Sequence, residues 1–415
     1  METSQSWIAN VEILNNLLRK ESWYNTFWAK FSGNVDISER DNGNPVYKPS
    51  GKPIEILNQF IAQGRDNMLI PFIKQLTGSP VYGDTVLKGT GEDQTMHWLR
   101  SYVNQYRKAV MKKSGSMSEQ RQKIFKMYEE ARPQLADWFT KWENQAIFQT
   151  FYEGVSPNLS TGTASDGLGL VRRYHPNWYC NDGDALTAVG TENQLTIESE
   201  LDTMESNTDK HMDAAILRKL RVKMMELKIP QIVSESGHKY WALIVHPQQL
   251  ATLQADSEYN NGYLYGNMGK GAGSMPQVHG MAAYFAGFCI FEDIVGIRSW
   301  DNTASANNFM GATTTTRFAA TAAGTSIYNA IAFGGSAIGK GVASDLSFTD
   351  EVDDHKNTVE IGGAVINGYN RADFFSETNA AETSAFSKNN AAVGDATGLA
   401  CTNQSSLIFA TKDPE

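Results

Sequence analysis

The stretch that decides the fold is SEQRQKIFKMYEEARPQLADWFTKWENQAIFQTFY, residues 118–152, in which almost every residue favours an α-helix. Its apolar side chains recur at steps of three and four residues and form one stripe: Leu135, Trp138, Phe139, Trp142 and Ala146. We expect a kink at Pro133, because proline cannot donate to the helical hydrogen-bond ladder. A continuous helix of this length would span about 50 Å, far more than the mean globular helix. The flanking segments have the composition of strands and loops, so the stretch predicts one long strut and not one helix of a bundle.

Composition and charge exclude several classes of protein. The 415 residues suffice for one large multi-lobed domain or two to three smaller ones, and 41% hydrophobic residues allow a substantial core. With 36 basic and 46 acidic residues the net charge is −10. This charge argues against a dedicated nucleic-acid-binding surface, but not against a surface that lies next to DNA. Three cysteines without a CxxC motif indicate neither a disulfide framework nor a zinc site. No signal-peptide pattern and no apolar run of about 20 residues occur, so we expect a soluble protein made in a reducing cytosol.

The first quarter of the chain contains an arm and a hairpin. Residues 6–31 are aromatic-rich and 33–51 are polar, which suits an arm that lies on this chain or on a neighbour. Residues 67–76 and 94–106 have strand composition, and a glycine-rich turn region separates them. Pro71 restricts the first strand to an edge or irregular position. An isolated ribbon of this kind is marginally stable in water, so we expect it to dock on another subunit.

The remainder alternates short elements with long polar loops. A helix is predicted over 208–227, where a basic cluster around Arg218 and Arg221 indicates a solvated face. The segment YWALIV predicts a buried strand at 240–245, and HPQQLATLQAD predicts a short helix after it. Long loops are predicted at 154–190 and 302–324, because both are rich in small polar residues. Further strands are expected at 282–291, 330–333 and 359–369, with one edge strand at 407–410 in a polar tail.

A glycine-rich run is the one motif that suggests an enzyme. In GGSAIGKG, residues 334–341, Gly334, Gly339 and Lys340 fit the G-x-x-x-x-G-K spacing of a phosphate-binding loop. Gly341 stands where a Ser or Thr hydroxyl should hold magnesium, and no clear later strand ends in an aspartate. A small-residue turn or short helix that packs tightly is the competing interpretation. A nucleotide-binding enzyme that uses this run is therefore the alternative function.

Other catalytic patterns are absent from the sequence. It has no G-x-S-x-G elbow, and its seven histidines form no HExxH or His-x-His pair. His246 follows YWALIV and precedes Pro247, where a helix cap or a turn is the expected role. We therefore expect no catalytic residue, no cofactor and no metal ion.

An ordered set of segments resembles one family. The run GKPIEILNQFIAQGRDNMLIPFIKQLTGSPVYGDTVLKGTGEDQTMHWLRSYVNQYRKAV resembles the extended-loop region of tailed-phage major capsid proteins, in which a strand, a "G-D-t-v-L-x-G" tip and a return strand precede a long spine helix. YWALIVHPQQLATLQAD is similar to that family's strand–"HP"–helix segment. GMAAYFAGFCIFED, AIAFGGSAIGKGVAS and VEIGGAVINGYNRADFF follow in the family's order. The resemblance covers roughly residues 50–375, and the inserts at 154–190 and 302–324 and the Ala/Asn-rich tail depart from it.

The resemblance implies an α+β, Hong-Kong-97-type capsid fold. Its parts would be an N-terminal arm (1–52), an extended β-hairpin loop (53–112), a peripheral domain with spine helix 118–152 and second helix 208–227 (113–229), an axial domain (230–330), a return to the peripheral domain (331–375) and a C-terminal tail (376–415). It also implies candidate intersubunit contacts at Arg65, Tyr82, Asp84, Lys88, Glu92, Trp98 and Tyr102.

The function implied is that of a structural protein and not an enzyme. Such a protein self-assembles as hexamers and pentamers into the icosahedral head that encloses the double-stranded DNA of a tailed phage. Its implied partners are copies of itself, a portal protein and, in some systems, a scaffold, a protease or decoration proteins. Packaged DNA would lie against the inner surface without sequence-specific binding, and no membrane is involved. The location implied is the virion, after synthesis and assembly in the host bacterial cytoplasm.

Overall fold

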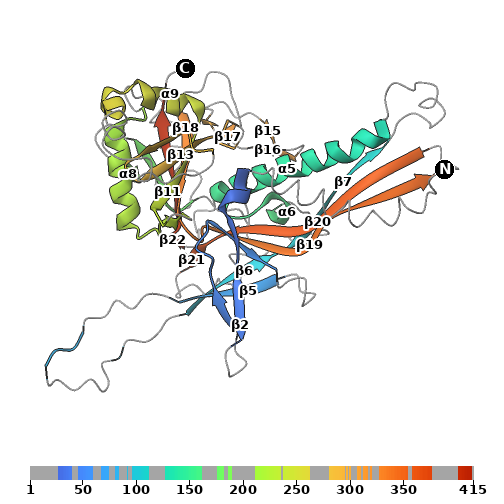
Figure 1. Cartoon of the computed structure of the whole chain (residues 1–415), viewed down its shortest axis with the longest axis horizontal. Coiled ribbons are helices and arrows are strands. Elements are labelled where there is room, and N and C mark those ends of the chain that lie inside the picture. Colours follow the sequence, from blue (N-terminus) through green and yellow to red (C-terminus); the bar gives the residue numbers. More distant parts are fainter. Residues whose placement is uncertain are drawn as a thin grey trace.

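Two β-sheets and one long helix form the framework of the chain (Figure 1). None of the described helices is both long and apolar enough to span a membrane. The computed structural model describes these residues: 27–39, 45–58, 67–73, 80–83, 91, 96–111, 127–160, 175–181, 186–188, 211–234, 237–261, 280–294, 296–297, 299–300, 306–309, 312–315, 318–319, 327–353, 358–375 and 401–413.

The long helix is α5, Met127–Glu153, and it confirms the predicted strut. Residues 118–126, where the helix was expected to begin, lie outside the described residues. Pro133 lies inside α5 and does not end it, so the kink itself stays a prediction. The predicted apolar stripe faces the protein: Leu135, Phe139, Trp142 and Ala146 are buried, and Trp138 is half-buried. Tertiary packing of this stripe therefore stabilises the helix.

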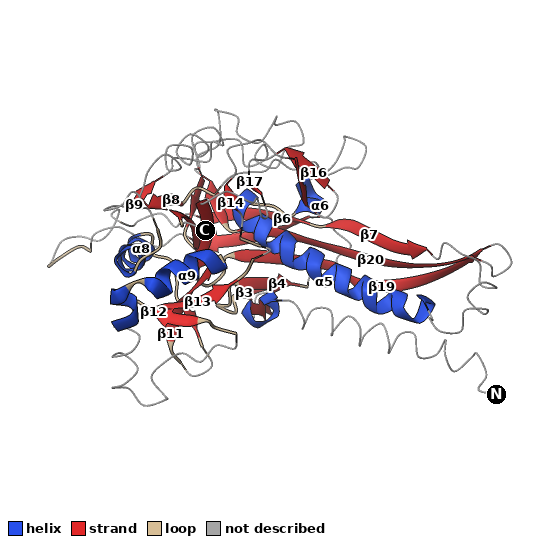
Figure 2. Ribbon diagram, turned by 90° about the horizontal axis from the view of Figure 1, so that it is seen from above, coloured by secondary structure: helices blue, strands red, loops and turns tan. Residues whose placement is uncertain are grey.

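The first sheet has five strands in the order β1-β4-β19-β20-β7. Figure 2 shows α5 lying along β7, β20 and β19. Leu135 and Phe139 pack on this sheet, where a Cβ added to Gly363 would lie 2.5 Å from Cε2 of Phe139. Glycine at this position therefore lets the helix approach the backbone of β20 closely. The strands are β1 Ser32–Asn34, β4 Ile54–Leu57, β7 Asn104–Met111, β19 Ile338–Asp353 and β20 Thr358–Arg371.

The second sheet has ten strands, with the main order β12-β13-β11-β18-β23-β8-β9. Both of its faces are covered, which explains why a central strand such as β11 is apolar at nearly every position. Tyr240 and Ile244 face the core that contains the second half of α5, whereas Trp241 and Leu243 face the core beneath helices α8 and α9. The members are β8 Trp178–Asn181, β9 Leu186–Ala188, β10 Ile232–Val233, β11 Lys239–Val245, β12 Ala283–Phe285, β13 Phe288–Glu292, β14 Ser299–Trp300, β17 Phe318–Ala319, β18 Ile327–Phe333 and β23 Ser406–Lys412.

The two helices on the outer face confirm two predictions. The expected helix 208–227 is α8, Ala214–Glu226, and the short helix after YWALIV is α9, Pro247–Ala255. The exposed Arg218 of α8 pairs with Glu258, in agreement with a solvated basic face. The expected grouping of α8 with the spine helix differs from the observed packing, because Leu217, Leu220 and Met224 contact the ten-stranded sheet.

Three predictions about loops and edges are wrong. The predicted edge strand at 407–410 is β23, which lies inside the ten-stranded sheet with β18 antiparallel on one side and β8 parallel on the other. The predicted loop at 154–190 contains α6 (Pro157–Ser160), β8 and β9. Strand β8 is buried and pairs with β23, which comes more than 200 residues later, and a local sequence pattern cannot reveal such a distant pairing. The predicted loop at 302–324 contains the paired strands β15 (Ala306–Phe309) and β16 (Ala312–Thr315), together with β17.

Smaller ribbons complete the described structure. The predicted hairpin is confirmed as β5, Asn67–Ile73, and β6, Met96–Tyr102, which form their own two-stranded sheet with Pro71 opposite Trp98. The other two-stranded ribbons are β2 (Asp36–Glu39) with β3 (Pro45–Lys48) and β21 (Asp373–Phe375) with β22 (Cys401–Asn403).

The described part of the aromatic segment, residues 27–31, lies on this chain. Residues Phe27–Phe31 form the 3-10 helix η1, in which Trp28 and Phe31 are buried. Trp28 stacks on Phe151 of α5 with ring centroids 5.4 Å apart, and Phe31 meets Phe333 of β18 edge-on at 5.4 Å. The segment thus fills the space between the spine helix and the ten-stranded sheet.

The two tryptophans of the stripe differ in burial, so they should contribute differently to the free energy of unfolding. Trp142 is 7% exposed and stacks on Tyr106 of β7, with ring centroids 3.9 Å apart. We expect Trp142→Ala to lower the free energy of unfolding by about 3–5 kcal/mol, because it removes a buried ring. Trp138→Ala should cost less, because Trp138 is half-buried. Urea unfolding followed by circular dichroism measures both, and a native-like transition for Trp142→Ala would contradict the assignment.

Candidate functional site

The predicted intersubunit contacts fall on and around the β5–β6 hairpin. Trp98 lies in β6, Tyr102 is the last residue of that strand opposite Asn67, and Tyr82 is 79% exposed in the segment between the strands. The structure thus places Trp98 and Tyr102 on one strand. Their contacts with neighbouring subunits stay a prediction. The other predicted contacts lie outside the described residues: Arg65, Asp84, Lys88 and Glu92.

The glycine-rich run 334–341 is a turn followed by a strand, and its glycines serve close backbone contacts. The amide of Gly334 donates to the carbonyl of Ser405 at 2.8 Å, and the amide of Gly335 donates to the carbonyl of Pro230 at 3.1 Å. A Cβ added to Gly334 would lie 1.9 Å from the Pro230 carbonyl oxygen. A phosphate-binding loop needs free amides at a helix N-terminus, whereas these amides are already bonded and a strand follows.

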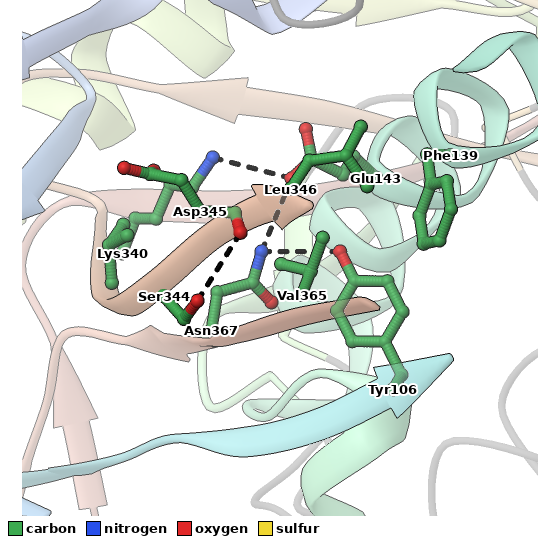
Figure 3. A pocket seen from close by; sticks show the side chains of 10 residues that line it. Tyr106, Phe139, Glu143, Lys340, Ser344, Asp345, Leu346, Val365 and Asn367 are labelled. Carbon is green, nitrogen blue, oxygen red and sulfur yellow. Dashed lines mark hydrogen bonds and ion pairs between the residues drawn. The ribbon is translucent and has the colours of Figure 1, made fainter. Parts of the chain in front are cut away.

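Lys340, the lysine of this run, is the counter-ion of a glutamate from the spine helix. Figure 3 shows its Nζ directed at Oε1 of Glu143, and the two atoms are 3.4 Å apart. Both side chains are about nine-tenths buried, at 9% and 11% exposed. The Asn367 amide donates to the same Glu143 oxygen at 3.2 Å and also to the hydroxyl of Tyr106 at 3.2 Å. Burial and the Glu143 charge raise the pKa of Tyr106 well above its ordinary value.

The space beside this pair is too small for a nucleotide. The cavity of about 60 Å³ is lined by Lys340, Glu143 and Asn367 together with further polar and apolar side chains, Ser344 and Asp345 among them. Pockets for drug-sized ligands typically measure about 300–1,000 Å³. The geometry therefore gives the nucleotide-binding alternative no support, and the cluster joins α5 to β19, β20 and β7.

A second buried polar cluster joins the two sheets at the end of the spine helix. Arg371, the last residue of β20, binds Asp373 through two hydrogen bonds of 2.8 Å, and both side chains are fully buried. Its third nitrogen donates to the carbonyl of Phe151 at 2.7 Å. That carbonyl belongs to the last turn of α5, where helical carbonyls lack helical partners, so the guanidinium stabilises the helix end.

Residues just before β8 and β23 of the ten-stranded sheet, together with Ser406 of β23, complete the cluster. The Asn403 amide donates to Oδ1 of Asp373 at 3.0 Å, and its carbonyl oxygen accepts the backbone amide of Ser406 at 2.8 Å. His175, just before β8, accepts the amide of Asn177 at Nδ1, so its Nε2 carries the proton and donates to Ser406 Oγ at 2.9 Å. Burial and the Arg371 charge lower the pKa of His175 well below its ordinary value, which keeps the ring neutral.

No sequence pattern predicted this second cluster. Arg371 and Asp373 lie in the quoted segment VEIGGAVINGYNRADFF, His175 lies in the predicted loop 154–190, and Asn403 lies in the predicted polar tail. The available signal was an Arg and an Asp two residues apart, a spacing that puts both on one face of an extended segment that follows an apolar strand. In contrast, the expected cap role of His246 is confirmed: its Nδ1 accepts the amide of Gln248, and the Gln249 side chain accepts the amide of His246.

Comparison with known proteins gives a consistent result. The capsid of Ralstonia phage GP4 matches with a TM-score of 0.61 at 15% identity, over 94% of this chain and 92% of that chain. The cyanophage Pam1 capsid matches with a TM-score of 0.55 at 14% identity, over 88% and 89%. The head of the Helicobacter pylori bacteriophage KHP40 matches with a TM-score of 0.54 at 10% identity, over 94% and 92%. No curated protein matches the chain.

These likenesses, together with two sheets and a long spine helix, define a protein with the Hong-Kong-97-type capsid fold. A family model described as phage capsid protein matches residues 49–386. The chain belongs to this family and is a major capsid protein, which forms the head of a tailed phage as a multimeric shell.

The neutral, buried His175 should make the subunit sensitive to acid. Its pKa is lowered in the folded state, so its contribution to stability is complete above the unfolded-state pKa of about 6.5 and is lost as the pH falls below it. The free energy of unfolding should therefore fall by up to about 1.4 kcal/mol per pH unit from this residue. His175→Gln should flatten urea-derived stability between pH 6.5 and 5, whereas the control His238→Asn, at a half-buried residue just before β11, should keep the slope. An unchanged slope in His175→Gln would refute the assignment.

The Lys340–Glu143 pair gives a second stability test. Lys340→Met leaves the buried carboxylate of Glu143 without its counter-ion, so the free energy of unfolding should fall by about 3–5 kcal/mol. The double variant with Glu143→Gln should recover most of that loss, because the orphaned charge is removed. Urea titrations of the single and double variants measure the coupling. Additive losses would show that the two side chains do not act as a pair.

Proposed function

We propose that the protein assembles as hexamers and pentamers into an icosahedral head that encloses double-stranded DNA. The observation that carries this proposal is the β5–β6 hairpin, which shares strand pairing with neither main sheet in the described part of the chain. A two-stranded ribbon is marginal by itself in water. A neighbouring subunit is the natural partner of such a ribbon in a protein that forms a multimeric shell.

The parts of the fold take the following roles in this proposal. The five-stranded sheet with α5 forms the peripheral domain, and the ten-stranded sheet with α8 and α9 forms the axial domain. Residues 53–112 include the extended loop, and the residues before them form the N-terminal arm. The assignment of α8 to the axial domain is supported by its packing on β11 and β13.

In this proposal the protein has a structural role without catalysis: the shape of the subunit determines its contacts in the shell. Packaged DNA lies against the inner surface without sequence-specific binding, in keeping with a net charge of −10. A portal protein is the expected partner at one vertex, and a scaffold, a protease or decoration proteins are further candidate partners. Synthesis and assembly take place in the cytoplasm of the host bacterium.

Electron microscopy and size-exclusion chromatography of the expressed protein test assembly. Closed particles or sheets are the expected outcome, and a stable monomer under all assembly conditions would refute the proposal.

Deletion of the hairpin tip separates folding from assembly. Removal of residues 77–92 leaves 74–76 and 93–95 to connect β5 and β6, a length that suits a hairpin loop. We expect a folded subunit with an unchanged melting transition that forms no closed shells. Trp142→Ala is the matched comparison, because it should damage the subunit itself. Normal particles from the deletion variant would show that the tip makes no essential intersubunit contact.

A further inference from the structure

The outer part of the five-stranded sheet narrows to a three-stranded ribbon. Strand β4 pairs with β19 only along Ile338–Gly341, so beyond Gly341 the described sheet consists of β19, β20 and β7. Figure 1 shows these strands running to the end of the molecule opposite the ten-stranded sheet. We call this part, residues 342–353 of β19 with 358–366 of β20 and 105–111 of β7, the outer ribbon.

In the described part of the chain, no further strand pairs with the outer side of β7 or of β19 along the outer ribbon, and these two edges carry opposite charges. On the β7 edge, Arg107 and Lys108 are exposed. On the β19 edge, Asp350 and Glu351 are exposed. Strand β20 lies between the edges and separates them by two strand spacings, about 10 Å. Neighbouring side chains of a strand point to opposite faces of the sheet, so each edge strand carries exposed charge on its faces.

This arrangement selects one kind of contact between copies. Exposed strand edges tend to associate, and charged side chains limit that association to suitable partners. Two β7 edges would bring basic residues together, and two β19 edges would bring acidic residues together, so both like contacts are repulsive. A β7 edge that faces a β19 edge is attractive.

We infer that the β7 edge of one subunit contacts the β19 edge of a second copy, with Arg107 and Lys108 facing Asp350 and Glu351. The contact joins two different surfaces of the same chain, so it repeats head to tail, and it generates a ring of copies where the rotation between neighbours closes. The inference rests on the proposed assembly into a shell and adds to it the residues that determine which copies may meet.

Charge reversal tests the contact. The basic-edge variant Arg107→Glu/Lys108→Glu and the acidic-edge variant Asp350→Lys/Glu351→Lys each create like charges across the contact, so each should fold but lose particle formation. The quadruple variant that combines both reversals restores opposite charges and should regain particles. Co-expressed with the wild type, the quadruple variant should form separate particles, because mixed contacts place like charges together. Epitope tags and affinity purification of particles measure the mixing.

Controls separate this inference from the proposed function and from misfolding. Lys228→Glu/Lys239→Glu reverses two exposed lysines in the region of the ten-stranded sheet and should leave particle yield unchanged. Lys108 lies over the ring of Trp138, 5.6 Å from its centroid, so a milder pair, Arg107→Glu and Glu351→Lys, serves if the full set fails to fold. A wild type that forms no particles would refute the shell proposal. Wild-type particles together with normal particles from either edge variant, or mixed particles with the quadruple variant, would overturn the inferred contact.

Discussion

One buried charge pair, Arg371 with Asp373, fixes the position of both sheets relative to the long helix. Arg371 ends β20 of the five-stranded sheet, and its guanidinium also binds a carbonyl in the last turn of α5. Asp373 receives a hydrogen bond from Asn403, which in turn positions the start of β23 in the ten-stranded sheet. A buried pair costs several kcal/mol in desolvation per ion, so it stabilises only the arrangement in which every remaining donor and acceptor is satisfied. Such a pair favours one relative placement of the sheets over neighbouring ones.

The spine helix α5, held in this position, contributes side chains to two hydrophobic cores. Leu135 and Phe139 pack on the five-stranded sheet, whereas Phe148 and Phe151 pack with η1 and the ten-stranded sheet. The Glu143–Lys340 pair lies between these two groups of contacts along the helix. Displacement of α5 against either sheet would therefore disturb both cores and both polar clusters. This coupling makes the subunit one mechanical unit, as a shell wall requires.

The sequence predicted the elements whose evidence is local. The stripe on α5, the apolar run of β11 and the His246 cap of α9 each depend on residues within a few positions of one another. Strand β8 and the interior position of β23 were missed, because the two strands pair with each other across a long separation in sequence. The Lys340 run fitted a phosphate loop because close backbone contacts select the same glycines that a phosphate cradle needs. The Arg371 cluster was not predicted, because only its burial distinguishes it from a solvated pair of charges and burial cannot be read from these few residues.

The interior position of β23 bears on how a subunit is made. Strands β8, β11 and β18 leave the ribosome first, and β23, which must enter between β18 and β8, is synthesised after all of them. Until residue 406 has emerged, two partial sheets present open apolar edges that pair only with the missing strand or with another chain. A polypeptide interrupted before this point thus cannot close its own sheet. Because β23 is translated last, only a complete polypeptide can fold into a subunit that joins the capsid shell. The time before β23 emerges is also the interval in which nascent chains are most prone to aggregate.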